Sequence, residues 1–451
     1  MGLMPSSPVT AQTYTILHNF ANAFSNNDGA LPRDGLILSG NSLYGTTSQG
    51  GSARDGMVFK VNTDGTGFTN LHSFTGTNDG TGPEAGLVLS GNILYGTTVG
   101  GGSSGDGTVF RVNTDGTGFT NLYSFSAVVG SSYTNNDGEQ PYAGLVLSGN
   151  TLYGTAAYGG TSGAGTVFKI NTDGTGFTNL HNFVNYTNND GANPYGTLIL
   201  SGDILYGTTF GGGGSPWGTV FQINTDGTCF TNIYNFAYTN GANPYAGLLL
   251  SGNTLYGTTE QGGIGGYGTV FKVNTDGTGF TNLWSFAFTN GLTPYAGLVL
   301  SGNALYGTTE NGGSGNPQAG FVFKVNTDGT SFNDLYNFAN TNGALPLAGL
   351  VLSGVTLYGT TWQGGTVHYG TVFSLSFAPQ LTISPFETNV VLNWPTNLAG
   401  FDYTGFGLYS TTNLVPPVVW STVSPGLVII NGLCVVTNPA SGTGKYYRLS
   451  Q

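Results

Sequence analysis

Residues Tyr245–Phe286 read YAGLLLSGNTLYGTTEQGGIGGYGTVFKVNTDGTGFTNLWSF and contain four short apolar segments. These segments are Gly247–Leu250, Thr254–Thr259, Thr269–Val273 and Phe280–Phe286. The SGN sequence after the first segment predicts a tight turn, and NTDG after the third predicts a hairpin, because Asp-Gly between apolar runs favours that turn. The stretch lacks the period of an amphipathic helix, so we expect four antiparallel strands.

The same unit recurs along the chain. Its LYGT motif occurs seven times, at intervals of 50 to 58 residues. The tyrosines of the motif are Tyr44, Tyr95, Tyr153, Tyr206, Tyr256, Tyr306 and Tyr358. Units of four short strands repeated at this period are typical of propeller blades. We therefore predict an all-β fold, a seven-bladed β-propeller.

The two ends of the repeated region complement each other. After the seventh LYGT motif, the third-strand pattern occurs at Thr371–Leu375, but no fourth strand follows. Thr13–Phe20 matches the fourth-strand pattern and stands alone at the start of the chain. We expect this N-terminal segment to complete the last blade and close the ring, which also removes exposed sheet edges. The expected propeller spans residues 13–377 and follows a tail at residues 1–12.

The combination of LYGTT, a Gly pair and GTVFKVNTDGTGFTNL, repeated over Thr13–Phe377, resembles the bacterial GloVer tandem repeat of choice-of-anchor proteins. The Gly pair and the strand order are more distantly similar to kelch blades, although the fourth-strand Trp of kelch blades occurs only at Trp284. The resemblance implies an exported, often surface-anchored protein, and it supplies no catalytic residues.

The composition changes after Phe377. The segments LTISP, NVVLNW, GFGLYSTT, VVWSTV, LVIING and KYYRLS have the pattern of strands. Residues 378–451 therefore predict a separate, small β-sandwich. This part resembles the fibronectin-type or immunoglobulin-like modules that are appended to exported bacterial proteins.

Charge excludes several classes of partner. Charged residues make up 7% of the 451 residues, and Lys plus Arg number only 9 against 21 Asp plus Glu. This composition provides no basic surface for phosphates, so we expect no nucleic-acid partner and no binding to anionic lipid. No run of about 18 apolar residues is present, so we expect no membrane insertion. Cys229 and Cys434 fall in different predicted domains and form no disulfide framework. We expect a monomer.

The sequence indicates the cellular location of the protein less directly. Residues 1–12 lack the apolar stretch of roughly 7–15 residues that a signal peptide needs. Two interpretations stay open, namely a sequence start that has lost its export signal and a protein that is not exported. Together with the family resemblance, the first interpretation predicts an extracellular or cell-surface location.

The candidate binding residues lie in variable loops. In an up-and-down blade, the loops after the second and fourth strands share one face, and here they vary in length, whereas the SGN and NTDG turns of the other face are nearly identical. We place ligand binding on the variable face. Its candidate ligand-binding residues are Tyr158, Phe210, Trp217, Tyr267, Trp362 and Tyr369. Aromatic planes beside Asn, Gln and carboxylates suit sugar rings, so a glycan or another cell-surface component is the candidate partner.

Four further tyrosines share one position, directly after a proline. They are Tyr142, Tyr195, Tyr245 and Tyr295. Their recurrence favours packing between blades, and contact with a ligand is the alternative.

Three residues are candidates for catalysis. Glu260 and Glu310 occupy equivalent positions in adjacent units, and His368 is the one histidine in a variable loop. Two carboxyls about 5 Å or 6.5–9.5 Å apart would support glycoside hydrolysis. Two solvated acids at the rim are the other interpretation. His18, His72 and His181 share a fourth-strand position with Tyr and Trp, which indicates a packing role.

The repeated Asp-Gly turns do not predict a metal site. Lys or Arg occupies the first ligand position of a calcium-loop pattern in five of the six NTDG motifs, and a cation there opposes a metal. Acidic turns at Asp28, Asp79, Asp137 and Asp190 are replaced by Asn240, Asn290 and Asn342 in later units, as turn geometry permits. We therefore expect no metal and no cofactor.

These observations favour an exported, non-enzymatic protein that acts as a binding or structural module at the cell surface, with carbohydrate as the candidate ligand. A polysaccharide hydrolase or lyase with its site on the variable face is the alternative. A passive spacer is the third interpretation.

Overall fold

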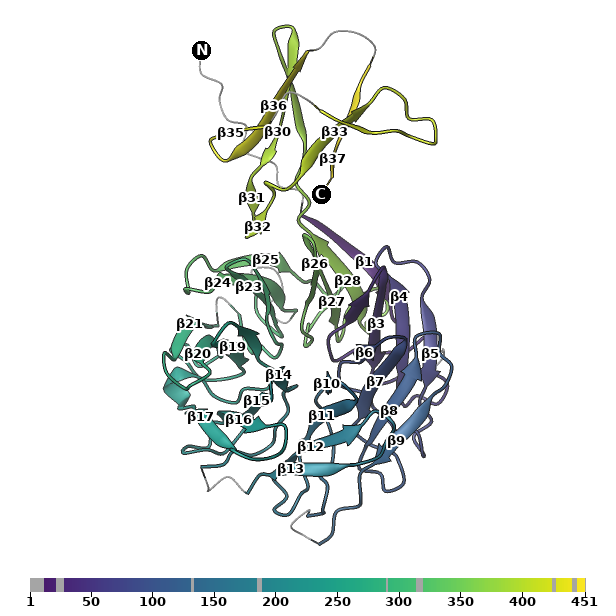
Figure 1. Cartoon of the computed structure of the whole chain (residues 1–451), viewed down its shortest axis with the longest axis vertical. Coiled ribbons are helices and arrows are strands. Elements are labelled where there is room, and N and C mark those ends of the chain that lie inside the picture. Colours follow the sequence, from purple (N-terminus) through teal and green to yellow (C-terminus); the bar gives the residue numbers. More distant parts are fainter. Residues whose placement is uncertain are drawn as a thin grey trace.

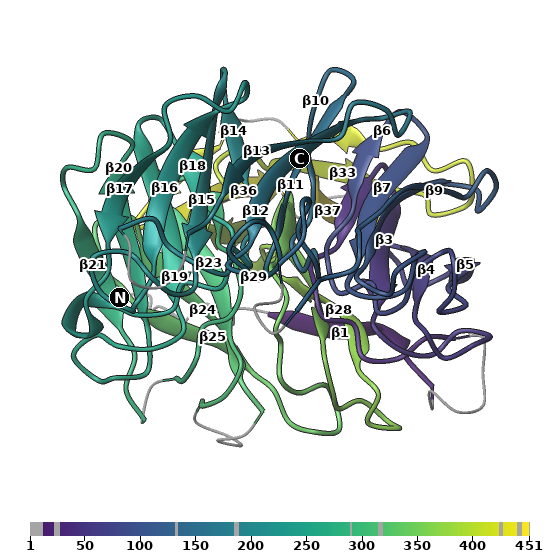
Figure 2. The same ribbon diagram turned by 90° about the horizontal axis from the view of Figure 1, so that it is seen from below.

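The computed structural model describes residues 12–21, 28–130, 134–184, 189–288, 291–313, 319–423, 427–439 and 444–450. The described residues up to 377 form seven four-stranded antiparallel sheets. The sheets lie side by side around a common centre (Figure 1). Figure 2 shows the same arrangement from the side, with connecting loops at the two ends of the strands.

Six of the seven sheets use their strands in chain order, and the seventh combines β26–β28 with β1. The first strands are β2 (Ile37–Ser39), β6 (Val88–Ser90), β10 (Val146–Ser148), β14 (Ile199–Ser201), β18 (Leu249–Ser251), β22 (Val299–Ser301) and β26 (Val351–Ser353). The second strands are β3 (Ser42–Thr47), β7 (Ile93–Thr98), β11 (Thr151–Ala156), β15 (Ile204–Thr209), β19 (Thr254–Thr259), β23 (Ala304–Thr309) and β27 (Thr356–Thr361). The third strands are β4 (Met57–Asn62), β8 (Thr108–Asn113), β12 (Thr166–Asn171), β16 (Thr219–Asn224), β20 (Thr269–Asn274), β24 (Phe321–Asn326) and β28 (Thr371–Ser376). The fourth strands are β5 (Thr69–Ser73), β9 (Thr120–Ser124), β13 (Thr178–Asn182), β17 (Thr231–Asn235), β21 (Thr281–Ser285) and β25 (Asn333–Asn337), with β1 (Thr13–Asn19) beside β28.

The predicted strands of the unit at 245–286 agree with β18–β21 to within two residues at either end, and β19 matches at both ends. Close packing between two strands of the unit explains the LYGT glycine. A Cβ on Gly257 would lie 2.6 Å from Cζ of Phe271 on the paired strand and 2.9 Å from Leu248 Cδ2. Only glycine leaves room for the Phe ring of the TVF sequence, so the two motifs depend on each other.

Adjacent sheets contact each other through one repeated ring stack. A fourth-strand side chain lies flat against an aromatic ring of the next sheet, with ring centroids 3.6–4.2 Å apart. The pairs are His18–Phe68, His72–Phe119, Tyr123–Phe177, His181–Phe230, Tyr234–Phe280, Trp284–Phe332 and Tyr336–Tyr14. The packing role predicted for the three histidines agrees with these contacts, and the last pair joins β25 to the N-terminal strand β1.

The C-terminal residues form two small antiparallel sheets and a short hairpin. The four-stranded sheet contains β29 (Thr382–Phe386), β30 (Asn389–Pro395), β36 (Leu433–Pro439) and β35 (Val428–Ile430). The three-stranded sheet contains β34 (Ser421–Thr422), β33 (Gly407–Thr411) and β37 (Tyr446–Ser450), and the hairpin pairs β31 (Asn397–Leu398) with β32 (Phe401–Asp402). The segment predicted as VVWSTV is a strand only at β34, and the hairpin has no counterpart in the prediction. Cys434 is buried in β36 and Cys229 is exposed, and both are free.

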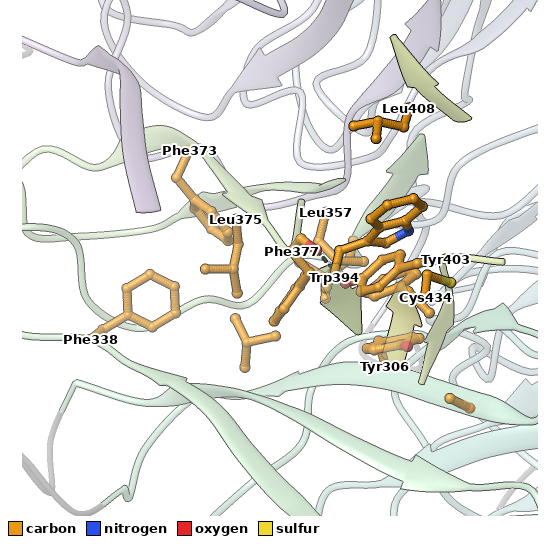
Figure 3. Packing of buried hydrophobic residues seen from close by; sticks show 14 of the residues in the cluster. Tyr306, Phe338, Leu357, Phe373, Leu375, Phe377, Trp394, Tyr403, Leu408 and Cys434 are labelled. Atoms are coloured by element: carbon orange, nitrogen blue, oxygen red, sulfur yellow. Dashed lines mark hydrogen bonds between the residues drawn. The ribbon is translucent and has the colours of Figure 1, made fainter. Parts of the chain in front are cut away.

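The C-terminal strands share a core with the sixth and seventh sheets (Figure 3). Tyr306 of β23 stacks on Phe401 with 5.1 Å between ring centroids, and its hydroxyl donates a 2.7 Å hydrogen bond to the Ala399 carbonyl. Trp394 and Tyr403 are fully buried in the same cluster. No helix in the described part of the chain is long and apolar enough to cross a membrane.

Candidate functional site

The residue after the loop proline faces the centre of the molecule in all seven units. These post-proline residues are Arg33, Glu84, Tyr142, Tyr195, Tyr245, Tyr295 and Leu347. All seven line one cavity of about 280 Å³, together with Asp34, Glu310 and Trp362. We call this space the central cavity. The four tyrosines therefore lie on its wall, where they also contact one another between neighbouring units, as the packing interpretation expects.

The same hydrogen bonds position this wall from unit to unit. The residue two positions before each proline forms a bridge with the loop just after the second strand, as Ala242 does with Gln261. A threonine at the end of the second strand then binds the next unit, as when Thr208 Oγ1 donates a 3.0 Å hydrogen bond to the Ala246 carbonyl. The loops after the second and fourth strands thus meet at the cavity, as predicted for the variable face.

Arg33 is held at the cavity by groups from two other units. Its guanidinium lies 2.8 Å from the Glu84 carboxylate and 5.1 Å from the centre of the Trp362 ring. Its charge also lowers the pKa of Glu310, against the larger effect of burial. Arg33 is therefore a paired cation, fixed between a carboxylate and an aromatic face.

Tyrosines form one side of the cavity. Tyr195 stacks on Tyr245 with 4.7 Å between ring centroids, and Tyr245 contacts Tyr295 at 4.6 Å. Phe210 meets the edge of Tyr195 at 5.5 Å, and the Tyr158 hydroxyl hydrogen-bonds the Tyr195 hydroxyl. Burial raises the pKa of Tyr195 and Tyr245, and it raises the pKa of Tyr295 to about 12, so these hydroxyls stay protonated.

Carboxylates also line the cavity. Asp34 accepts backbone hydrogen bonds from Gly35 at 2.5 Å and Gly86 at 2.6 Å, and these oppose the rise in its pKa that burial causes. Glu310 accepts a 3.0 Å hydrogen bond from Thr293 Oγ1, and burial raises its pKa. Burial also raises the pKa of Glu260, and the charge of Glu310 adds to that rise. Glu260 and Glu310 are thus electrostatically coupled.

Two buried polar atoms, one on the lining residue Trp362 and one on Glu260 outside the lining, have no hydrogen-bond partner among the described residues. They are the Nε1 atom of Trp362, which is a donor, and the Oε2 atom of Glu260, which is an acceptor. A buried polar atom without a partner costs roughly 1–3 kcal/mol. A ligand that supplies one acceptor and one donor would remove both costs.

The candidate residues from the sequence fall into two groups. Trp362 and Glu310 line the central cavity, and Tyr158 and Phe210 support its tyrosine wall. Trp217, Tyr267 and Tyr369 precede third strands away from that lining. Trp217 packs against Tyr238 at 5.0 Å, Tyr267 is 6.3 Å from Phe288, and Tyr369 packs on the core between the last and first sheets.

His368 is exposed next to Tyr369 and does not line the cavity. Asn290 and the loop end at Gln318 lie outside the described residues. Of the tail at 1–12, only Gln12 is described. Among the described residues, no group of three or more His, Cys, Asp or Glu side chains is arranged to hold a metal ion.

Sequence reasoning missed Arg33, Asp34 and Glu84. The signal was present in the repeat alignment, because PRDG and PEAG stand in the first two units where later units have PYAG. A charged residue at a position that is otherwise aromatic or apolar indicates a specialised unit.

The comparisons with known proteins come from sequence and from structure. The family model described as the Gloeobacter/Verrucomicrobia repeat matches residues 6–188, 128–317 and 183–373. No curated protein matches the chain. A puromycin-hydrolyzing peptidase of Mycobacterium tuberculosis is similar with a TM-score of 0.50 and 14% identity, over 81% of this chain and 59% of that chain.

Two other solved structures are similar at slightly lower scores. An oligogalacturonate lyase in complex with manganese has a TM-score of 0.49 and 11% identity, over 82% of this chain and 94% of its own. A putative 6-phosphogluconolactonase from Bacteroides uniformis has a TM-score of 0.48 and 15% identity, over 93% and 100%. At these identities, the likeness concerns the fold alone, a propeller-like arrangement of four-stranded sheets.

Proposed function

The chain belongs to the Gloeobacter/Verrucomicrobia repeat family, and from the lining of its central cavity we propose that it is a non-enzymatic carbohydrate-binding protein. The observation that carries the proposal is that the stacked tyrosines and Trp362 line the same cavity, and that the Trp362 Nε1 donor has no hydrogen-bond partner among the described residues. Binding sites for small ligands combine apolar walls with a few placed polar groups, and this cavity has both.

Sugar chemistry matches this lining in two respects. The aromatic rings offer surfaces for the apolar face of a pyranose, and the tyrosine hydroxyls, Arg33 and Trp362 Nε1 offer donors to its hydroxyl oxygens. The Arg33–Glu84 pair is already formed without a ligand, so it presents a preorganised polar edge.

The test is binding of neutral and charged oligosaccharides to the full chain, measured by glycan array and by calorimetry. The variant Trp362→Phe keeps an aromatic ring but removes the N–H donor together with part of the indole. It should weaken binding about tenfold, equivalent to about 1.4 kcal/mol. The matched control is Trp420→Phe in the C-terminal part, which should leave binding unchanged. Failure of every glycan to bind at high concentration would contradict the proposal.

The finer architecture is part of the same proposal. We take the seven sheets as the blades of a closed propeller over residues 13–377, followed by an immunoglobulin- or fibronectin-like β-sandwich at 378–451. Support comes from the Tyr336–Tyr14 stack, which repeats at the last joint the contact made at the other six. The Thr360 Oγ1 atom also donates a hydrogen bond to the Asp34 carbonyl, as equivalent threonines do to the following unit. Two further parts of the proposal, kelch-like blades and a location at the cell surface, are supported only by the resemblance of the repeats.

A second candidate function is a polysaccharide hydrolase or lyase. The observation in its favour is the electrostatic coupling of Glu260 and Glu310 beside the cavity. Release of reducing ends from any polysaccharide, abolished by Glu260→Gln or Glu310→Gln, would establish this function in place of simple binding.

A further inference from the structure

The described cavity lining carries an excess of negative charge. One cation, Arg33, stands against the three carboxylates Asp34, Glu84 and Glu310. Glu84 neutralises Arg33 at 2.8 Å, and Asp34 accepts two backbone N–H groups. Glu310 has a neutral partner, the hydroxyl of Thr293. Among these three carboxylates, Glu310 has neither an ion pair nor a second hydrogen bond in the described structure, although the charge of Arg33 acts on it.

Glu260 adds to this charge from the adjacent unit. Its Oε2 atom is buried and has no hydrogen-bond partner in the part of the chain that the structure describes. The charges of both Glu260 and Glu310 raise the pKa of Tyr295, which lines the cavity together with Glu310. A donor that carries a positive charge would satisfy the orphaned oxygen and offset both charges.

From this arrangement, and resting on the proposed carbohydrate-binding function, we infer that the central cavity selects sugars with a protonated amine, held by Glu310 against the tyrosine wall, with the Glu260 charge adding to the attraction from outside the lining. An ammonium group supplies three N–H donors and a charge that tyrosine rings attract. An N-acetylated sugar lacks that charge. A uronic acid brings a carboxylate toward three others and is repelled.

The experiment uses the full chain and three probes of equal length: glucosamine oligomers at a pH where the amine is protonated, N-acetylglucosamine oligomers and galacturonate oligomers. The glucosamine oligomer should bind about tenfold more tightly than the acetylated one, a difference of about 1.4 kcal/mol. Glu310→Gln should remove most of that preference. Glu387→Gln makes the same chemical change at an exposed site in the C-terminal part and should leave the preference intact.

A second variant should change the preference for the free-amine oligomer in the opposite direction. Arg33→Gln removes the one cation of the described lining, so it should raise the preference for glucosamine over N-acetylglucosamine oligomers, whereas Glu310→Gln lowers that preference. A merely structural effect would weaken binding in both variants. Thermal unfolding of each variant confirms that it is folded.

The outcomes separate this inference from the proposed function. Equal binding of acetylated and free-amine oligomers, lost in Trp362→Phe, overturns the amine selectivity and leaves carbohydrate binding in place. Binding of a lysine peptide with no binding of any sugar overturns both and assigns the site to a peptide amine. Absence of binding to all probes also overturns both.

Discussion

At the scale of single residues, two series of substitutions along the repeats belong together. Where a fourth strand carries His, the following turn carries Asp, as in His18–Asp28 at 2.8 Å and His181–Asp190 at 3.0 Å. Where the strand carries Tyr in later units, the turn carries Asn, as in Tyr336–Asn342 at 2.6 Å. Each pair fixes the loop that leads to the next unit, so the substitutions in the two series compensate each other.

The pair of His72 and Asp79 tests this compensation. Asp79 contacts His72 at 3.3 Å and accepts the backbone N–H of Thr75 at 3.0 Å. Asp79→Ala leaves both groups without this partner and should lower the free energy of unfolding by about 1–3 kcal/mol. The double variant His72→Tyr with Asp79→Asn recreates the later pair and should stay within about 1 kcal/mol of the parent. Denaturant unfolding measures both, and a double variant as unstable as Asp79→Ala would refute the pairing.

Glu139 makes the stability of the folded protein depend on pH. It is 6% exposed, and burial, together with the charge of Asp106, raises its pKa from 4.5 to about 7. Between these values the folded state keeps a proton that the unfolded state releases, so its contribution to stability is complete below pH 4.5 and is lost as pH rises through 7. The loss should reach about 3 kcal/mol at most. Unfolding curves of Glu139→Gln should lack this component, and identical pH profiles for parent and variant would contradict it.

At the scale of elements, the hairpin at NTDG depends on a carboxylate cap. In the fifth unit, Asp276 Oδ1 accepts the backbone N–H of Thr278 at 2.9 Å and its hydroxyl at 2.6 Å. Gly277 adopts a positive φ of 82°, which glycine tolerates without strain. The same turn recurs in six units, so local sequence alone specifies it.

Stability at low pH should reflect these turns. The Thr278 hydrogen bonds lower the pKa of Asp276 below its usual 3.8, so the folded state favours the charged form. The resulting stabilisation is complete above pH 3.8 and is lost as pH falls through the lowered pKa. Asp276→Asn should reduce the change in denaturation midpoint below pH 4, and Thr278→Ala, which keeps the carboxylate, should shift that change toward pH 3.8. A variant profile that matches the parent would exclude this cause.

At the scale of the whole molecule, the two ends of the repeated region meet on one sheet. β1 pairs with β28, with Thr13 opposite Ser376 and Tyr14 opposite Leu375. The core between the last and first sheets contains Leu36 with Tyr358 and Val372. Contacts between residues more than 300 positions apart therefore attach β1 to the last sheet, which makes exchange of this strand between chains a competing outcome.

An engineered disulfide tests the pairing of β1 with β28. The variant Thr13→Cys with Ser376→Cys, in a Cys229→Ser background, should form a crosslink within one chain under oxidation and stabilise the protein by about 2–4 kcal/mol. Non-reducing electrophoresis distinguishes the crosslinked monomer from a dimer joined between chains. Each single cysteine variant is the control. Dimers in place of crosslinked monomers would indicate strand exchange, and absence of any crosslink would contradict the pairing.

The sequence by itself determined the strands, their turns and the repeat, because hairpin signals and alternating apolar residues act over a few neighbouring positions. It also supplied Glu310 and Trp362, which stand out within their units. Only the tertiary structure brought Arg33, Glu84 and Trp362 together and showed that post-proline residues of all seven units line one cavity. The reason is that these contacts join positions 51 to more than 300 residues apart, and their geometry depends on how the sheets are arranged around a common centre.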